Sequence, residues 1–279
     1  MSELRTYADA WVTATASLQQ LVASLSPADF ERPTDCPGWS VLDVLAHLAA
    51  LERELATGEQ PANVQPIEGR GPAAWWTEAG VTERRGRQPA EVLAEYREMV
   101  ARRAADLAER LPDDPGGKPE RTPGAVAWDN RTLLRNRVLD TWVHEQDIRR
   151  ATDHPGGLTG APAEIVEGIF SAAWPFVLAK RAAAPAGTRI GVVLDGRRSD
   201  YVVSADGRGR QLDPAEADVP DDPEGIDDAD AVISLNREAL TILGAGRRTP
   251  DDLPDTALLS LTGDLDLAGR VLAGLNVTP

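Results

Sequence analysis

The chain has 279 residues, 42% of them hydrophobic, so it is long enough for one large domain or two ordinary domains with real cores. Its formal net charge of −16 is spread along the sequence and argues against binding to nucleic acids or anionic membranes. The single cysteine, Cys36, excludes an intramolecular disulfide framework.

The N-terminal residues lead directly into an amphipathic helical pattern, without the basic start and apolar core of a signal peptide. No apolar run approaches the roughly 20 residues that span a bilayer. We therefore expect a cytoplasmic protein that does not bind membranes.

Apolar residues at helical spacing predict four long helices, which Pro- and Gly-bearing loops separate: Glu3–Leu25, Ser40–Thr57, Pro89–Leu111 and Thr132–Thr152. Ser40 and Asp43 resemble a capping box at the start of the second helix. Four long helices joined by loops are typical of an antiparallel bundle, whose core is a usual place for a metal site.

The pattern changes in the last third of the chain. A further helix, kinked by a proline, is followed by four strands, two of them in a hairpin that turns at Gly196, and by two short helices. These elements are expected at Ala163–Arg181, Thr188–Leu194, Asp200–Ala205, Asp230–Leu235, Asn236–Leu243, Leu258–Thr262 and Leu265–Leu275. The predicted fold class is therefore a helical bundle in residues 1–182, followed by a smaller α+β domain in residues 183–279.

Three residues on two of these helices form a candidate metal site. Asp140 and His144 are four residues apart and therefore lie on one face of the fourth helix. His47 lies on the second helix, which we expect to pack beside the fourth. Two imidazoles and one carboxylate suit zinc or a similar divalent ion and leave a coordination position open for a reacting molecule. The alternative interpretation is an ordinary Asp–His pair on a helix face.

Other residues are weaker candidates for a functional role. Asp147 is predicted to assist cofactor binding by orienting His144, or else is a surface acid. Arg247 and Arg248 follow a glycine-bearing turn and are candidates for binding an anionic group, although such a pair is more often solvated. Cys36 lies in a loop with no histidine near it in sequence, so we do not expect it to be a nucleophile. The sequence contains no phosphate-binding loop, dinucleotide fingerprint or nucleophile elbow.

One segment carries a family resemblance. The sequence Asp-Cys-Pro-Gly-Trp-Ser-Val-Leu-Asp-Val-Leu-Ala-His-Leu at residues 35–48 resembles the signature of the mycothiol-dependent maleylpyruvate isomerase family, which belongs to the wider group of DinB-like metal-binding bundles. Residues 228–275 resemble the small C-terminal domain of that family, which is related to sterol-carrier proteins. The resemblance implies that His47, Asp140 and His144 bind the metal, with aspartate standing where the family has glutamate.

The resemblance also implies a chemistry. The thiol mycothiol binds the metal through its sulfur, loses its proton and adds to an electrophilic small molecule, in an isomerase or a transferase reaction. Arg247 or Arg248 is then the candidate for the arginine that family members place near the thiol. Three alternatives stay open: a metal-dependent hydrolase of the same fold, a non-catalytic protein that binds a small molecule or lipid, and a family member that has lost catalysis, which the aspartate at position 140 allows. We expect a monomer or homodimer.

Overall fold

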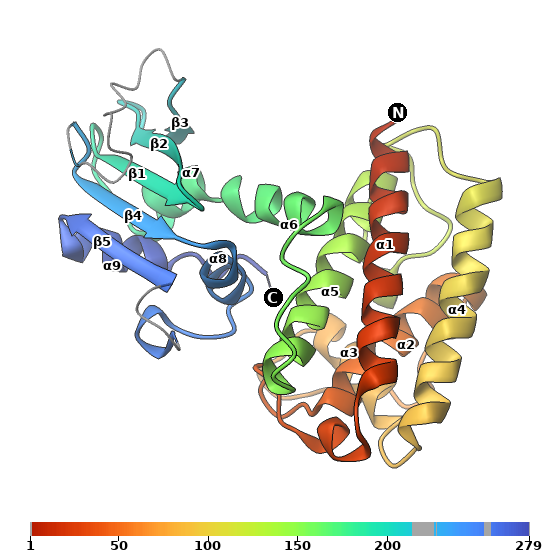
Figure 1. Cartoon of the computed structure of the whole chain (residues 1–279). Coiled ribbons are helices and arrows are strands. Elements are labelled where there is room, and N and C mark those ends of the chain that lie inside the picture. Colours follow the sequence, from red (N-terminus) through yellow and green to blue (C-terminus); the bar gives the residue numbers. More distant parts are fainter. Residues whose placement is uncertain (1, 214–225, 227, 254–257, 279) are drawn as a thin grey trace. The chain divides into compact units, whose positions relative to one another are not determined.

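The computed structural model describes residues 2–213, 226, 228–253 and 258–278 (Figure 1). The chain forms two compact units, residues 1–165 and 166–279. The division predicted between residues 182 and 183 lies further along the chain. The two differ because most of the helical segment that begins at Ala161 belongs to the second unit.

The first unit contains four long helices among its described residues: α1 (Glu3–Ser24), α2 (Val41–Thr57), α4 (Pro89–Glu109) and α5 (Asn130–Ala151). Helix α1 packs mainly against α5, and α2 mainly against α4. The predicted helix ends agree with these bounds to within two residues. The shorter helix α3 (Pro72–Thr82), which packs against α2, and the 3-10 turns η1 (Pro27–Glu31) and η2 (Pro123–Ala125) were not predicted.

Helix α2 begins and ends as its sequence dictates. The Ser40 side chain accepts a hydrogen bond from the Asp43 backbone N–H, and the Asp43 carboxylate accepts one from the Ser40 backbone, which confirms the predicted capping box. Gly58 ends the helix with a φ of 82°, a left-handed conformation that glycine adopts without strain. Between these ends, Leu45 and Leu48 are fully buried in the core of the unit.

The second unit contains a sheet with five strands among its described residues, in the order β3-β2-β1-β4-β5. Strands β1 and β4 are parallel, and the other neighbouring strands are antiparallel. The strands are β1 (Arg189–Leu194), β2 (Arg197–Val203), β3 (Gly209–Gln211), β4 (Ala231–Leu235) and β5 (Leu259–Gly263). The helices are α6 (Ala161–Ser171, shared with the first unit), α7 (Trp174–Phe176), the π-helical turn η3 (Val177–Arg181), α8 (Arg237–Gly244) and α9 (Leu265–Ala273), with the 3-10 turn η4 (Pro250–Asp252) before β5.

Gly207 and Gly209 lie two residues apart but have different roles. Gly207 does turn the chain, but Gly209 begins strand β3 and pairs with Val203. A side chain at Gly209 would lie 1.9 Å from the carbonyl oxygen of Pro175, so glycine is required where this strand meets α7. The glycine therefore marks close packing rather than the end of an element.

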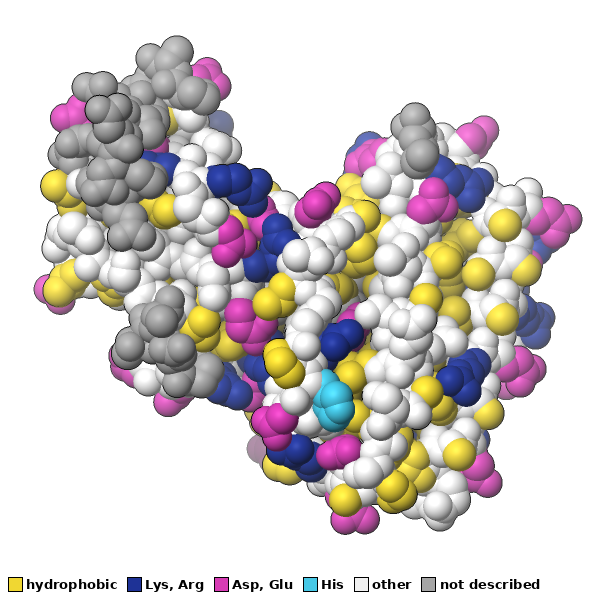
Figure 2. Space-filling model, in the orientation of Figure 1, with side chains coloured by type: hydrophobic (Ala, Val, Ile, Leu, Met, Phe, Trp, Pro, Cys, Tyr) yellow, Lys and Arg dark blue, Asp and Glu magenta, His cyan; other side chains and the backbone are white. Residues whose placement is uncertain are grey.

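One helical stretch, Ala161–Arg181, is long and apolar enough to cross a membrane by length and composition alone, which the sequence analysis did not anticipate. The core helix of a soluble protein meets the same condition. In this stretch Phe170, Trp174 and Val177 are at most 1% exposed, whereas Phe176 is 55% exposed, and the α-helix is interrupted after Ser171. On the face shown in Figure 2, acidic and basic side chains alternate over the surface rather than forming one basic patch.

Candidate metal centre

The structure brings together the three predicted metal ligands. His47 on α2 and His144 on α5 lie with ring centroids 5.0 Å apart in an edge-to-face arrangement. The Nε2 atoms of His47 and His144 lie 3.4 and 3.6 Å from the same oxygen, Oδ1 of Asp140. Donor atoms of all three residues lie within 4.8 Å of one another. The two helices therefore meet as the sequence predicted, with both imidazoles facing one carboxylate.

Burial differs within this trio. The side chains of His47 and His144 are 8% and 9% exposed, whereas that of Asp140 is 28% exposed. Trp39, from the loop before α2, covers the two rings, with its ring centroid 5.2 Å from that of His47 and 6.3 Å from that of His144. Solvent therefore reaches the trio beside Asp140, and the tryptophan shields the imidazoles.

His144 is held in one orientation by a second carboxylate. Its Nδ1–H donates to Oδ2 of Asp147 over 3.0 Å, and Asp147 is fully buried. This hydrogen bond leaves Nε2 directed at Asp140, an arrangement that is common among metal-binding histidines. By contrast, Nδ1 of His47 is buried and has no hydrogen-bond partner among the described residues, so packing alone positions that ring.

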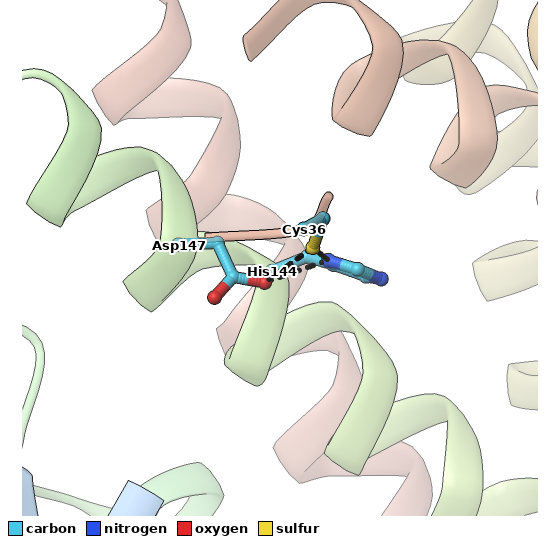
Figure 3. A group of neighbouring side chains, drawn as sticks. All are labelled: Cys36, His144 and Asp147. Carbon is cyan, nitrogen blue, oxygen red and sulfur yellow. Dashed lines mark hydrogen bonds and ion pairs between the residues drawn. The ribbon is translucent and has the colours of Figure 1, made fainter. Parts of the chain in front are cut away.

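A second donor group shares His144 and comprises Cys36, His144 and Asp147 (Figure 3). The Cys36 thiol donates to Oδ2 of Asp147 over 3.3 Å, and its sulfur lies 3.9 Å from Nδ1 of His144. The other oxygen of Asp147 accepts from Arg150 over 2.6 Å. Cys36 and Asp147 thus both contact the same imidazole nitrogen. A nucleophilic triad requires them on opposite nitrogens, so this group serves to orient His144.

The charges around the trio shift its ionisation. Burial raises the pKa of Asp140, but the charge of Arg137, followed by those of the two histidines, lowers that pKa well below its ordinary value. Burial lowers the pKa of His144, whereas Asp140, the hydrogen bond to Asp147 and the nearby Cys36 together raise it to about 10. Burial lowers the pKa of His47, and Asp140 offsets this in part. Asp140 is thus ionised, and its charge favours the protonated form of the neighbouring His144 imidazole.

Sequence reasoning missed Arg137 and Glu52 and did not place Cys36 beside His144. Arg137 on α5 binds Oδ2 of Asp140, Glu52 on α2 binds Arg137, and Cys36 lies beside His144. The three- and four-residue spacing of Arg137, Asp140 and His144 on one helix face was the available signal for Arg137. Glu52 and Cys36 are brought to the site by tertiary packing.

Two predicted residues lie in the second unit. Arg247 follows α8 and donates from Nη1 to the carbonyl oxygen of Ala245 over 3.0 Å, and both Arg247 and Arg248 are half-buried. The role of these two arginines stays a prediction.

Comparison with known proteins places the trio in a family context. Residues 11–149, which contain all three donor residues, match the family profile described as the mycothiol maleylpyruvate isomerase N-terminal domain. Two uncharacterized proteins from strains of Mycobacterium tuberculosis, CDC 1551 / Oshkosh and H37Rv, are each 28% identical to the chain over 186 residues. Each alignment covers 59% of this chain and 68% of the relative.

Solved structures show the same fold. The crystal structure of mycothiol-dependent maleylpyruvate isomerase is similar with a TM-score of 0.50, and that of its histidine-to-alanine mutant with a TM-score of 0.51. Both are 15% identical in sequence, and the match covers 93% of this chain and 92% of theirs.

Proposed function

Because the chain belongs, through residues 11–149, to the mycothiol maleylpyruvate isomerase family, we propose that it is an enzyme that uses mycothiol to act on an electrophilic small molecule. The observation that carries this proposal is the convergence of His47 Nε2 and His144 Nε2 on one oxygen of Asp140. The donor types suit zinc, and Asp147 orients His144 as a metal ligand requires. A divalent metal held by these three residues would supply Lewis acidity that favours the ionised form of a bound thiol.

The residues of the chain have defined tasks in this proposal. Asp147 fixes the tautomer of His144, and Trp39 keeps water from one side of the imidazoles. The more exposed side, at Asp140, is where thiol and electrophile enter. The thiol sulfur forms a bond to an electrophilic carbon. The π bond of the electrophile breaks as this bond forms. In an isomerase the thiolate leaves after rotation and the π bond forms again, and in a transferase the neighbouring carbon takes up a proton and the sulfur stays. This scheme needs no protein nucleophile, which agrees with a Cys36 thiol that donates to Asp147.

We also propose that the first unit is a DinB-like four-helix bundle and the second a sterol-carrier-like domain. The four long helices and the five-stranded sheet described above support this assignment. Arg247 and Arg248 stay candidates for binding the anionic groups of the thiol or the electrophile. The expected location is the cytoplasm, and the expected assembly is a monomer or homodimer.

Metal content tests the proposal directly. The wild-type protein should hold about one divalent metal per chain, and His144→Ala should hold almost none. The third histidine, His154, lies in the loop after α5 and contacts Thr152, outside the trio, so His154→Ala is the matched control and should keep its metal. Equally negligible metal in the wild type and in His144→Ala would end the proposal.

Thiol dependence separates the alternatives. Turnover of maleylpyruvate or other electrophiles that rises with added mycothiol supports the thiol reaction. Turnover of the same strength without any thiol indicates a hydrolase. An apolar molecule that remains bound in native mass spectrometry, with no turnover, indicates a binding protein.

A further inference from the structure

Arg137 connects the candidate metal site to the buried charges of the helix core. Its side chain is 3% exposed, and its Nη1 donates to Oδ2 of Asp140 over 3.0 Å. The opposite edge of the guanidinium, Nε and Nη2, donates to one oxygen of Glu52 over 3.1 and 3.0 Å. A rigid planar group thus joins two carboxylates at a fixed separation, a task that the single ammonium of a lysine does not fulfil.

Glu52 keeps this arginine in place. Its side chain is fully buried, and its second oxygen accepts a hydrogen bond from Nη1 of Arg103 on α4 over 2.9 Å. The guanidinium of Arg103 in turn lies 4.7 Å from the ring centroid of Trp11 on α1. Both oxygens of Glu52 are therefore engaged, and Arg137 cannot turn away from Asp140 without breaking buried hydrogen bonds.

The two oxygens of Asp140 consequently face different partners. Oδ2 is engaged by Arg137, whereas Oδ1 faces the two imidazoles. We propose that Arg137 is a positioning residue that limits Asp140 to binding the metal through one oxygen. This inference rests on the proposed metal-dependent function and deepens it, because it concerns how the chain holds that metal.

The proposal predicts an effect opposite in sign to that of a merely structural arginine. A freed Oδ2 becomes available as a second ligand, and loss of the positive charge removes repulsion toward a divalent ion. Arg137→Gln should therefore bind the metal more tightly, by about tenfold, and with a higher coordination number. A residue that only supports packing would weaken metal binding when it is replaced.

Cobalt substitution supplies the spectroscopic signature. Four-coordinate Co²⁺ absorbs visible light more strongly than five- or six-coordinate Co²⁺. The wild type loaded with Co²⁺ should show the strong bands, and Arg137→Gln should show clearly weaker ones, while chelator competition gives both dissociation constants. Arg103→Gln is the matched control, because Arg103 binds the same Glu52 but not Asp140, and its bands should resemble those of the wild type.

The outcomes test the proposed metal-dependent function and the proposed role of Arg137 separately. A wild-type protein that binds no Co²⁺ overturns the proposed function. A wild type that binds Co²⁺, with the same bands and affinity in Arg137→Gln, overturns only the role of Arg137. If Arg137→Gln does not fold, Arg137→Lys replaces it: weaker bands support the role of the guanidinium, and unchanged bands overturn it.

Discussion

Replacing Glu52 by glutamine tests whether the buried charges stabilise the first unit. Glu52 is 0% exposed and accepts three hydrogen bonds from Arg103 and Arg137. Glutamine has nearly the same shape, but it carries no charge, and its NH₂ group faces donors. Removing one partner from a buried ion pair costs about 3–5 kcal/mol.

The loss of unfolding free energy expected for Glu52→Gln lies at the lower end of that range. After the change, Arg137 keeps its bond to Asp140 and Arg103 keeps its contact with Trp11. The amide oxygen still accepts from one arginine. We expect Glu52→Gln to lower the free energy of unfolding by about 3 kcal/mol. With an m value of about 2 kcal/mol per M, the urea midpoint falls by about 1.5 M.

Tryptophan fluorescence is the appropriate probe, because six of the seven tryptophans lie in residues 1–165. The measurement is made with a chelator present, so that bound metal does not add to stability. Glu120→Gln is the control, since the side chain of Glu120 is 79% exposed beside Arg121 and should contribute less than about 1 kcal/mol. Equal midpoints for the two variants would refute the reasoning.

Three further predictions concern other contacts. Burial raises the pKa of Glu95, but hydrogen bonds and charges of Arg84 and Arg87 outweigh it and lower that pKa below its ordinary value. The stabilisation by ionised Glu95 is therefore fully present above the ordinary pKa of 4.5 and is lost as the pH falls through the lowered pKa of the folded state. Glu95→Gln should cost about 2 kcal/mol at pH 7 and much less at pH 3, as urea titrations at both pH values will show. Gly80→Ala should cost about 1–3 kcal/mol in urea unfolding, because the added carbon would lie 2.7 Å from Cβ of Ala50. Gly168→Ala, with nothing within 4 Å of the added carbon, should be neutral or stabilising, and equal effects would contradict the packing argument. Asp147→Asn should weaken metal binding by about 10- to 100-fold in chelator competition, because it removes the charged acceptor of the His144 Nδ1–H; an unchanged affinity would count against the orienting role of Asp147.

The helices and the trio were predictable because their signals are local. The spacing of apolar residues sets the long helices, Ser40 and Asp43 mark a helix start, and four-residue spacing places Asp140 and His144 on one face. His47 joined them only through the expectation that α2 and α5 meet. The family resemblance agreed with that expectation, and the matched profile of residues 11–149 confirms the family.

The remaining features depend on contacts between distant segments. Strand β3 exists because Gly209 pairs with Val203 and passes close to Pro175, whereas its sequence alone resembles a turn. The thiol of Cys36 lies near His144, although 108 residues separate them in sequence. The helix interruption after Ser171 lies directly before Pro175, where the sequence predicted a proline kink. The division between the units at residue 165 depends instead on contacts between distant segments.

All four long helices of the first unit contribute to one chain of contacts that ends at the candidate site. Trp11 on α1 supports Arg103 on α4, which binds Glu52 on α2, which binds Arg137 on α5. Arg137 and Asp140 are three residues apart on the same face of α5. Asp140 therefore lies about one helical turn from the arginine that binds the buried Glu52. The Glu52–Arg137 pair therefore contributes both to the packing of the helices and to the orientation of Asp140. A change at Glu52 should then alter both the stability of the unit and its affinity for metal, whereas a change on the exposed surface should alter neither.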